Sequence, residues 1–243
     1  MFHFEKNFGL FIGKLKENIY HKHYALQISV SAKSKMELSV KNEKEIIGKS
    51  FFINSKVEHK LISNSNQLTV LINPLSSIGH QLHLQSRKSN FKLLNENLSN
   101  RLIETLNKFE TSEIDFEKLC ELIRQVLSEY QCTCESENHL DEQRIINTIK
   151  YMDANFEKVL SLEEVAEKCF LSPTRFLHLF KEKTNLTFRR YQLWNKLIKS
   201  LPFLVKNSIT ETAYTFGFSD SSHYTRTFKE TFGVTPKFLI SKT

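Results

Sequence analysis

Apolar residues along the chain follow two different spacings, which divide the sequence near residue 90. Before that point, apolar runs of strand length occur at residues 24–30 (YALQISV), 49–54 (KSFFIN) and 68–72 (LTVLI). Polar clusters such as residues 54–60 and 63–67 separate them. Short, closely spaced strands are typical of an antiparallel barrel or sandwich. The pattern therefore predicts that residues 1–90 form a β-rich domain.

After residue 90 the apolar residues recur every three or four positions, as on one face of a helix. Two such series, separated by a break at residues 111–115, predict a helical hairpin over residues 91–130. Its stripes can pack within the chain or form a dimer seam. Residues 131–140 are polar and aperiodic and predict a linker. The stripes comprise Leu93, Leu94, Leu98, Leu102, Ile103 and Leu106, then Phe116, Leu119, Cys120, Ile123, Val126 and Leu127.

Residues 141–243 are predicted to be helical throughout, and they contain an internal repeat. SLEEVAEKCFLS, from Ser161, matches SITETAYTFGFS, from Ser208. Each copy places Glu three residues after the Ser, which is the capping-box pattern of a helix start. Each is followed by a second matching segment, FKEKTNLT from Phe180 and FKETFGVT from Phe228. Two capped helices joined by a tight turn are a helix-turn-helix, so the repeat predicts two such units.

The second helix of each unit also has clear boundaries. Ser172 is a suitable N-cap with Pro173 at the first helical position, and Asp220 is the N-cap of the other copy. Asn185 and Gly233 tolerate the left-handed conformation that ends a helix. A third helix, roughly residues 188–200, joins the two units.

This region resembles the DNA-binding domain of the AraC/XylS family of bacterial transcription regulators. Some positions depart from the family pattern: Lys196 replaces an Arg, Ser200 replaces an Ala, Asn185 replaces a Gly, and Pro202 is expected to shorten or kink the connecting helix. The second unit carries the family signature at Ile209, Ala213, Gly217, Phe218, Asp220, Tyr224, Arg226, Phe228, Lys229, Gly233 and Pro236, and the first matches at Ala166, Ser172, Phe180, Lys181 and Thr184.

The resemblance implies that the second helix of each unit reads DNA. Outward-facing residues near its N-terminus would contact base edges, and neighbouring cations would contact phosphates. Arg226 suits guanine best, because its guanidinium can bind O6 and N7 together. The expected base-contacting residues are Thr174, Arg175, His178, Ser221, Ser222, His223, Thr225 and Arg226, and the expected phosphate-neutralising residues are Lys181, Arg189, Arg190, Lys196 and Lys229.

The N-terminal part resembles a degenerate cupin barrel, which many AraC-type regulators use as an effector domain. His21-x-His23-x3-Gln27 matches the first cupin motif with Gln in place of Glu, and His59 fits the second motif in part. We expect these four residues to bind a small organic effector. Because Gln27 replaces the carboxylate, no metal or other cofactor is predicted. Cys132-x-Cys134 with His139 matches no common zinc spacing and predicts linker thiols.

Together these features predict an α+β chain. A cupin-like effector domain (1–90), a helical hairpin (91–130) and a linker (131–140) precede an all-α DNA-binding domain with two helix-turn-helix units (141–243). The 243 residues carry a net charge of +7. Residues 141–243 hold 16 Lys and Arg against 11 Asp and Glu, which suits a polyanionic partner.

The function predicted is therefore sequence-specific transcription regulation, without enzymatic activity. The expected partners are promoter DNA, a small-molecule effector, a second copy of the chain and, in an activator, RNA polymerase. The four cysteines lack disulfide-scaffold spacing and no apolar stretch approaches about 20 residues, so we expect a soluble bacterial cytoplasmic protein with no membrane partner. Two alternatives are a cupin-type metalloenzyme with a helical appendage and a DNA-binding protein whose N-terminal part only dimerises.

Overall fold

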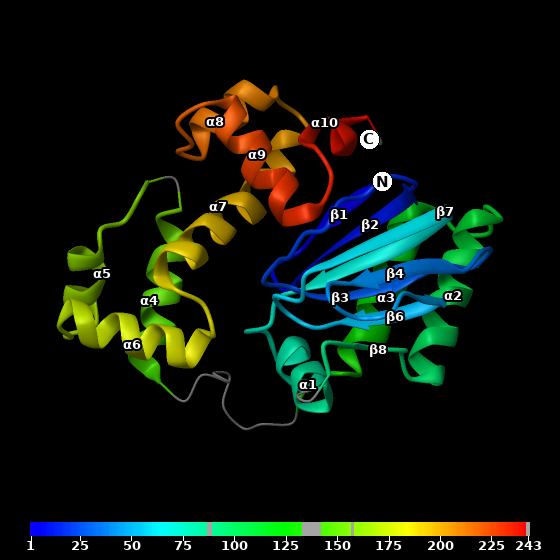
Figure 1. Cartoon of the computed structure of the whole chain (residues 1–243), viewed down its shortest axis with the longest axis horizontal. Coiled ribbons are helices and arrows are strands. Elements are labelled where there is room, and N and C mark those ends of the chain that lie inside the picture. The colour runs from blue at the N-terminus through cyan, green and yellow to red at the C-terminus, as the bar shows by residue number, and fades with distance from the viewer. Residues whose placement is uncertain (87–88, 133–141, 157, 242–243) are drawn as a thin grey trace. The chain divides into compact units, whose positions relative to one another are not determined.

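The computed structural model describes residues 1–86, 89–132, 142–156 and 158–241 (Figure 1). The chain divides into two compact units, one of Met1–Thr133 with Lys229–Thr243 and one of Cys134–Phe228. Residues 133–140 of the predicted linker, and with them Cys134 and His139, lie outside the described ranges. None of the described helices is both long enough and apolar enough to span a bilayer.

An antiparallel sheet forms most of the first unit, as the short apolar runs predict. Its strand order is β1-β2-β7-β3-β6-β8, and β4 pairs with both β5 and the first half of β7. Whether the domain belongs with the cupin barrels stays a prediction. The strands are β1 (Phe2–Phe4), β2 (Phe8–Leu15), β3 (Leu26–Val30), β4 (Met36–Val40), β5 (Ile46–Gly48), β6 (Ser50–Ile53), β7 (His59–Ile72) and β8 (Phe91–Lys92).

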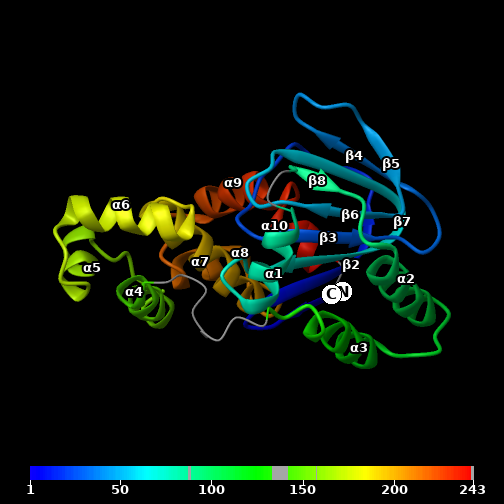
Figure 2. The same ribbon diagram turned by 90° about the horizontal axis from the view of Figure 1, so that it is seen from below.

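Side chains on the two faces of the sheet differ in polarity. In β3, Leu26, Ile28 and Val30 join a hydrophobic core, whereas Gln27 and Ser29 alternate with them and therefore point to the other face. The helices α1 (Ser77–Ser86), α2 (Glu96–Glu110) and α3 (Phe116–Ser128) contribute to the same core (Figure 2). The predicted hairpin over 91–130 is thus confirmed as α2 and α3, preceded by the short strand β8.

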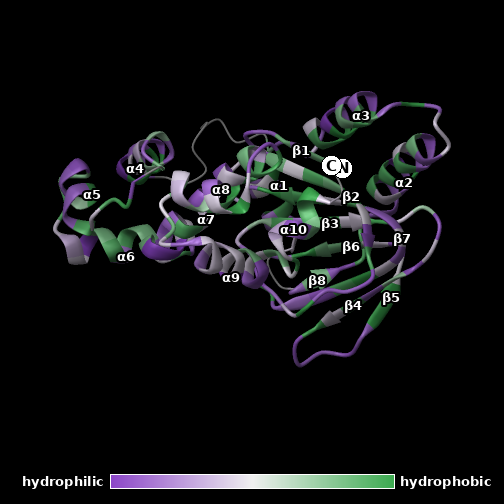
Figure 3. Cartoon of the chain, turned by 90° about the horizontal axis from the view of Figure 1, so that it is seen from above, coloured by the Kyte–Doolittle hydropathy of each residue, from purple (hydrophilic) through white to green (hydrophobic). Residues whose placement is uncertain are grey.

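The apolar stripes of α2 and α3 are used inside the chain. Leu102 and Leu106 of α2, and Leu119, Ile123 and Leu127 of α3, are fully buried in the core with the sheet. Figure 3 shows that both helices also carry hydrophilic residues, as amphipathic helices on a surface do. The stripe residues on α2 and α3 therefore pack within the chain, whereas Leu93, which precedes α2, is 60% exposed. A contribution of the hairpin to a dimer stays a prediction.

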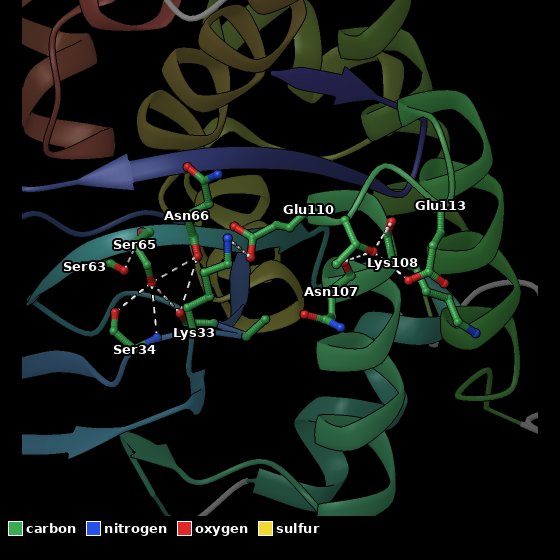
Figure 4. A network of polar contacts seen from close by, with 12 residues as sticks. Lys33, Ser34, Ser63, Ser65, Asn66, Asn107, Lys108, Glu110 and Glu113 are labelled. Carbon is green, nitrogen blue, oxygen red and sulfur yellow. Dashed lines mark hydrogen bonds and ion pairs between the residues drawn. The ribbon is translucent and has the colours of Figure 1, made fainter.

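The polar stretch 63–67, predicted to separate two strands, lies within β7. Ser65 Oγ is 2.9 Å from Ser31 Oγ and 2.6 Å from Ser34 Oγ, and Ser63 Oγ donates to the Ser65 carbonyl at 2.8 Å (Figure 4). The pairing of β2 with β7 also shifts register between Gly13 and Leu15. Hydroxyl contacts in this region supply bonds that let the strand continue through a polar sequence.

The helix α1 lies inside the range that the sequence pattern predicts to be β-rich, so this part of the prediction is wrong. Its buried residues include Ile78, Gly79 and Leu82. Gly79 packs directly on the chain before the helix: a Cβ there would lie 2.1 Å from the carbonyl oxygen of Asn73. Close approach of two backbones requires glycine, and this contact holds the helix at the end of β7.

The second part of the chain is helical, as predicted. The helix α7 continues through Pro202, which is 14 residues after its first residue, and ends at Leu204. The prediction that Pro202 shortens this helix is therefore wrong, and a kink at Pro202 stays a prediction. The helices are α4 (Gln143–Ala154), α5 (Leu162–Lys168), α6 (Pro173–Thr184), α7 (Phe188–Leu204), α8 (Ile209–Thr215), α9 (Ser221–Phe232) and α10 (Pro236–Ile240).

Candidate DNA-binding interface and histidine cluster

The first helix-turn-helix consists of α5 and α6, and its caps are the predicted ones. Ser161 Oγ accepts from the Glu164 amide at 3.0 Å, and Ser172 Oγ accepts from the Arg175 amide at 3.3 Å. Asn185 ends α6 with φ of 58°, the left-handed conformation expected there. In the turn, Phe170 also has a positive φ of 54° and its side chain is 94% exposed. A bulky residue in this conformation is strained.

The second unit, α8 and α9, repeats this geometry. Ser208 Oγ accepts from the Glu211 amide at 3.1 Å, and Asp220 Oδ1 accepts from the His223 amide at 2.7 Å. The latter bond lowers the pKa of the Asp220 carboxyl. Gly217 occupies the turn position of Phe170 and has φ of 67°. Both units therefore use a left-handed residue to turn between their helices.

Aromatic rings on the inner faces hold the second helix of each unit in place. In the first unit Phe176 and Phe180 are fully buried, and both contact Phe188 of α7 edge-on, with ring centroids 5.5 Å and 6.1 Å apart. In the second, buried Tyr224 contacts the rings of Phe218 and Phe228, with centroids 5.0 Å and 5.9 Å apart. Because these faces are filled, the opposite faces of α6 and α9 are left for a partner.

Most of the predicted DNA-contacting residues lie on those outer faces. Ser221 and Thr225 are half-buried. His223, whose direction the sequence left open, is exposed, with Nδ1 3.1 Å from Ser219 Oγ. The other exposed members are Thr174, Arg175, His178 and Lys181 on α6, Ser222, Arg226 and Lys229 on α9, and Arg189 and Arg190 in the first turn of α7.

The exposed cations of this surface share a second property, the lack of an acidic partner in the part of the chain that is described. In the N-terminal unit, by contrast, Arg101 pairs with Glu129 and Arg124 pairs with Glu5 at 2.6 Å. Cations without carboxylate partners remain available for phosphate oxygens. These cations are Arg175, Lys181, Arg189, Arg190, Arg226 and Lys229.

Lys196 does not belong to this surface, so its predicted role as a phosphate neutraliser is corrected. The residue is 6% exposed, and its Nζ donates to the Gly217 carbonyl at 3.2 Å. Burial lowers the pKa of its ammonium group. Its position on α7 brings it against the turn of the second unit. Lys196 therefore fixes that turn to α7 instead of facing solvent.

Another polar contact links α7 to the recognition helix α9. Ser200 Oγ lies 2.8 Å from Tyr224 Oη, and both residues are fully buried. Burial raises the pKa of the Tyr224 phenol to about 12. Sequence reasoning missed this pair, although Ser200 had been noted as a departure from the Ala usual in the family. The signal that could have revealed it is a hydroxyl on the buried face of α7, because buried hydroxyls are normally hydrogen-bonded.

The N-terminal half of α7 makes equivalent bonds with the first part of the domain. The Gln192 side-chain amide donates to the Leu160 carbonyl at 2.9 Å and accepts from the Leu160 amide at 3.2 Å. Asn195 Nδ2 donates to the Met152 carbonyl at 3.3 Å. The connecting helix is therefore bonded to both halves through buried or half-buried side chains.

In the N-terminal unit of the chain, the four predicted effector residues lie together, as expected. His21, His23, Gln27 and His59 are each at most 5% exposed. His21 and His59 form an isolated antiparallel bridge, with both backbone N···O distances at 2.9 Å. Gln27 Oε1 lies 2.9 Å from His23 Nε2 and 3.2 Å from His59 Nε2. Burial, which opposes the charged form, lowers the pKa of His21 to about 3 and also lowers the pKa of His23 and His59.

The chain is similar to known transcription regulators. A family model described as a helix-turn-helix domain matches residues 165–240. The probable transcriptional regulator LumQ of Photobacterium leiognathi is 26% identical over 231 residues, covering 91% of each chain. The HTH-type transcriptional activator RhaS of Mannheimia succiniciproducens is 31% identical over 165 residues, which cover 64% of this chain and 60% of that protein.

The fold is also similar to solved structures of ToxT from Vibrio cholerae. The apo protein of strain SCE256 has a TM-score of 0.66 at 16% identity, covering 98% of this chain and 99% of that one. An unsaturated fatty acid-bound form has a TM-score of 0.57 at 18% identity, covering 97% and 95%. The two capped helix-turn-helix units, the helix-turn-helix family match and the regulators related over most of the chain show that the chain is a DNA-binding transcription regulator with a helix-turn-helix domain of the AraC type.

Proposed function

We propose that the outer faces of α6 and α9 bind promoter DNA directly. The observation that supports this best is that both helices have a filled aromatic inner face and an outer face of polar residues and of cations that pair with no acidic side chain among the described residues. An exposed helix of this kind enters the major groove with its N-terminal residues against base edges. Partly exposed Thr225 and exposed Arg226 on α9, and Thr174 and Arg175 on α6, are placed for that role.

One chain would occupy two successive major grooves, about 34 Å apart on one face of the duplex. The two reading surfaces differ in sequence, with Thr174, Arg175 and His178 on α6, and Ser221, Ser222, Thr225 and Arg226 on α9. Because α6 and α9 carry different side chains and belong to one chain, they would recognise two different short DNA sequences in a fixed order. The site for one chain would therefore be a direct, non-palindromic pair of boxes.

Two substitutions on α9 test the proposal, after selection of the target sequence from random DNA. Arg226→Ala should cost about 1–3 kcal/mol and relax the preference at one position of one box. Lys229→Ala should weaken all sequences alike and reduce the slope of log K against log salt by about 1. Lys44→Ala, an exposed cation of the N-terminal unit, is the matched control and should change neither.

Titrations of matched and single-base-changed DNA at two salt concentrations give the answer. Equal losses on every sequence for Arg226→Ala would assign Arg226 to the phosphates. No loss for either variant, with normal binding by the control, would contradict docking of the second unit.

We further propose that the N-terminal unit controls DNA binding by responding to a small effector at His21, His23, Gln27 and His59. Their placement together inside the sheet domain supports this. The ToxT structures include one bound to an unsaturated fatty acid, so a protein of similar fold takes a small ligand. Replacing His21 and His23 together by Ala should abolish the effector response while DNA binding persists. An unchanged response would place effector binding elsewhere.

Assembly and partners form the last part of the proposal. Relatives named activators support contact with RNA polymerase at a bacterial promoter in the cytoplasm. Two linked DNA-binding chains gain affinity by raising the effective concentration of the second, so we propose a homodimer. Because the stripe residues of α2 and α3 are buried, a dimer contact of the hairpin would use its exposed residues, Leu93 among them. Light scattering at micromolar concentration, with and without DNA, tests it, and a strictly monomeric protein would contradict it.

A further inference from the structure

The outer side of α5, in the first helix-turn-helix unit, carries two carboxylates and an aromatic ring. Glu163 and Glu167 are both exposed, and because they are four residues apart their side chains lie on one side of the helix. Phe170 follows the C-cap of α5, and its amide donates to the Glu167 carbonyl at 2.9 Å. Its side chain is 94% exposed. These three residues form the α5 surface.

The carboxylates of the α5 surface are not neutralised within the described part of the chain. Neither Glu163 nor Glu167 forms an ion pair with a described cation, whereas Glu164 pairs with Lys158 at 3.1 Å. The nearby ammonium group of Lys168 lies over an aromatic ring of α4 instead, 5.5 Å from the ring centroid. Two negative charges therefore stay exposed on a domain that holds 16 Lys and Arg against 11 Asp and Glu.

The second unit shows that the fold does not require these residue types. The positions of the α5 surface are occupied in the repeat by Thr210, Tyr214 and Gly217, which are exposed as well. The buried positions Ala166 and Ala213 are, by contrast, identical. The glycine also adopts the left-handed turn without strain, whereas the first unit keeps a phenyl ring there at a conformational cost. The charges and the ring of the α5 surface therefore serve a purpose other than folding.

The chemistry of the α5 surface indicates which kind of partner it fits. Carboxylates repel phosphate oxygens, so this surface is unsuited to DNA although α6 of the same unit is placed to read DNA. Lys and Arg side chains are suited to it in two ways, since they pair with carboxylates and also bind over the face of an aromatic ring. Protein surfaces rich in Lys and Arg are typical of subunits that themselves bind DNA.

We propose that Glu163, Glu167 and Phe170 bind a basic surface of RNA polymerase, on the part of the polymerase that contacts promoter DNA. Only residues 169–172 separate α5 from α6, so a unit that docks through α6 brings the α5 surface next to a protein on the neighbouring DNA. The ring of Phe170 lies against Lys or Arg side chains of the polymerase, and the two carboxylates pair with them. The choice of this partner rests on the proposed function.

Two assays on the full-length chain test the surface. Titration of the selected DNA sequence measures DNA affinity, and retention of purified bacterial RNA polymerase on the immobilised chain, with and without that DNA, measures polymerase binding. Glu163→Gln combined with Glu167→Gln should weaken polymerase binding by about fivefold, and by less at high salt. Phe170→Gly should weaken it by about tenfold. Phe170→Tyr keeps the ring and should bind as the wild type does, and DNA affinity should not fall in any of these variants.

Two exposed residues elsewhere provide matched controls. Glu117→Gln on α3 removes a carboxylate, and Tyr214→Ala on α8 removes a ring from the second unit. Neither should change DNA affinity or polymerase binding. Melting temperatures are recorded for every variant. Because Phe170→Gly relieves backbone strain, it should melt no lower than wild type, so weaker polymerase binding by this variant does not come from unfolding.

Three results would overturn the α5 surface. One is wild-type protein that retains no polymerase, and another is equal retention by wild type, the double glutamine variant and Phe170→Gly. The third is an equal loss of DNA affinity in these variants, which would assign the residues to DNA. Wild-type protein that binds polymerase but no specific DNA sequence would contradict only the proposed function, because retention without DNA tests the surface by itself.

Discussion

The buried hydroxyl pair between α7 and α9 allows a quantitative prediction. Ser200 Oγ donates to the Leu197 carbonyl at 2.7 Å, so in its contact with Tyr224 it is the phenol that donates. Ser200→Ala leaves the phenol hydroxyl buried without its partner and should lower the free energy of unfolding by about 1–3 kcal/mol. Tyr224→Phe removes the donor but leaves Ser200 bonded to Leu197, and should cost only about 0.5–1.5 kcal/mol.

The double variant makes the prediction specific to this contact. In the Ser200→Ala variant the buried Tyr224 hydroxyl has lost its hydrogen-bond partner and only destabilises the protein, so removing this hydroxyl as well should recover stability. The double variant should therefore be destabilised by about 1 kcal/mol less than the sum of the single variants. Tyr224→Phe should even be stabilising in the Ser200→Ala background.

Urea unfolding followed by the fluorescence of Trp194 measures these free energies. Trp194 is the single tryptophan of the sequence and lies on α7, so its signal reports on the unit that contains the pair. Ser222→Ala, an exposed serine on α9, is the matched control and should stay within about 0.5 kcal/mol of wild type. Single effects that add within error, or a larger cost for Tyr224→Phe than for Ser200→Ala, would refute the reasoning.

Other predictions follow from particular residues. Phe170→Gly should stabilise the protein by about 0.5–1 kcal/mol, because the relief of left-handed backbone strain exceeds the entropic cost of an added glycine. Gly217→Ala should destabilise it by about 1 kcal/mol. The same urea titration measures both, and changes in unfolding free energy of the same sign would contradict the argument. Lys196→Met should leave the slope of log K against log salt for DNA binding unchanged, because Lys196 is buried, whereas Lys181→Met should reduce this slope by about 1. Titration of DNA at several salt concentrations measures the slope and so distinguishes a buried cation from one that contacts phosphate. Leu102→Ala, on the buried face of α2, should lower the free energy of unfolding by about 2–5 kcal/mol, which is measured as a lower melting temperature. An unchanged melting temperature would contradict the burial of Leu102.

The helix-turn-helix units could be predicted from the sequence because their signals are local. The caps at Ser161, Ser172 and Ser208, and the left-handed residues at Asn185 and Gly233, each act within about four residues of a helix end. A repeat of such signals in one order specifies two units without knowledge of long-range contacts. The same holds for α2 and α3, whose apolar period predicts helices whatever they pack against.

Only the tertiary structure decided what each face and polar group contacts. The continuation of β7 through the stretch at Ser65 depends on hydroxyls of Ser31 and Ser34, about 30 residues away. The burial of Lys196 depends on the position of Gly217, 21 residues further along the chain. Such contacts leave no periodic trace in the sequence, because the partner is set by packing and not by spacing.

The histidine cluster shows both contributions at once. The motif from His21 to Gln27 could be recognised in the sequence, because its residues are close together. The sequence could not show that the three Nδ1 atoms each meet a backbone carbonyl, nor that His59 arrives beside His21. Proton positions in a buried ring depend on the acceptor beside it, and strand pairing brings His59, 38 residues after His21, to that place. The sequence thus determined the residue types of the cluster, whereas the fold determined which ring nitrogens carry the protons and brought the side chains together.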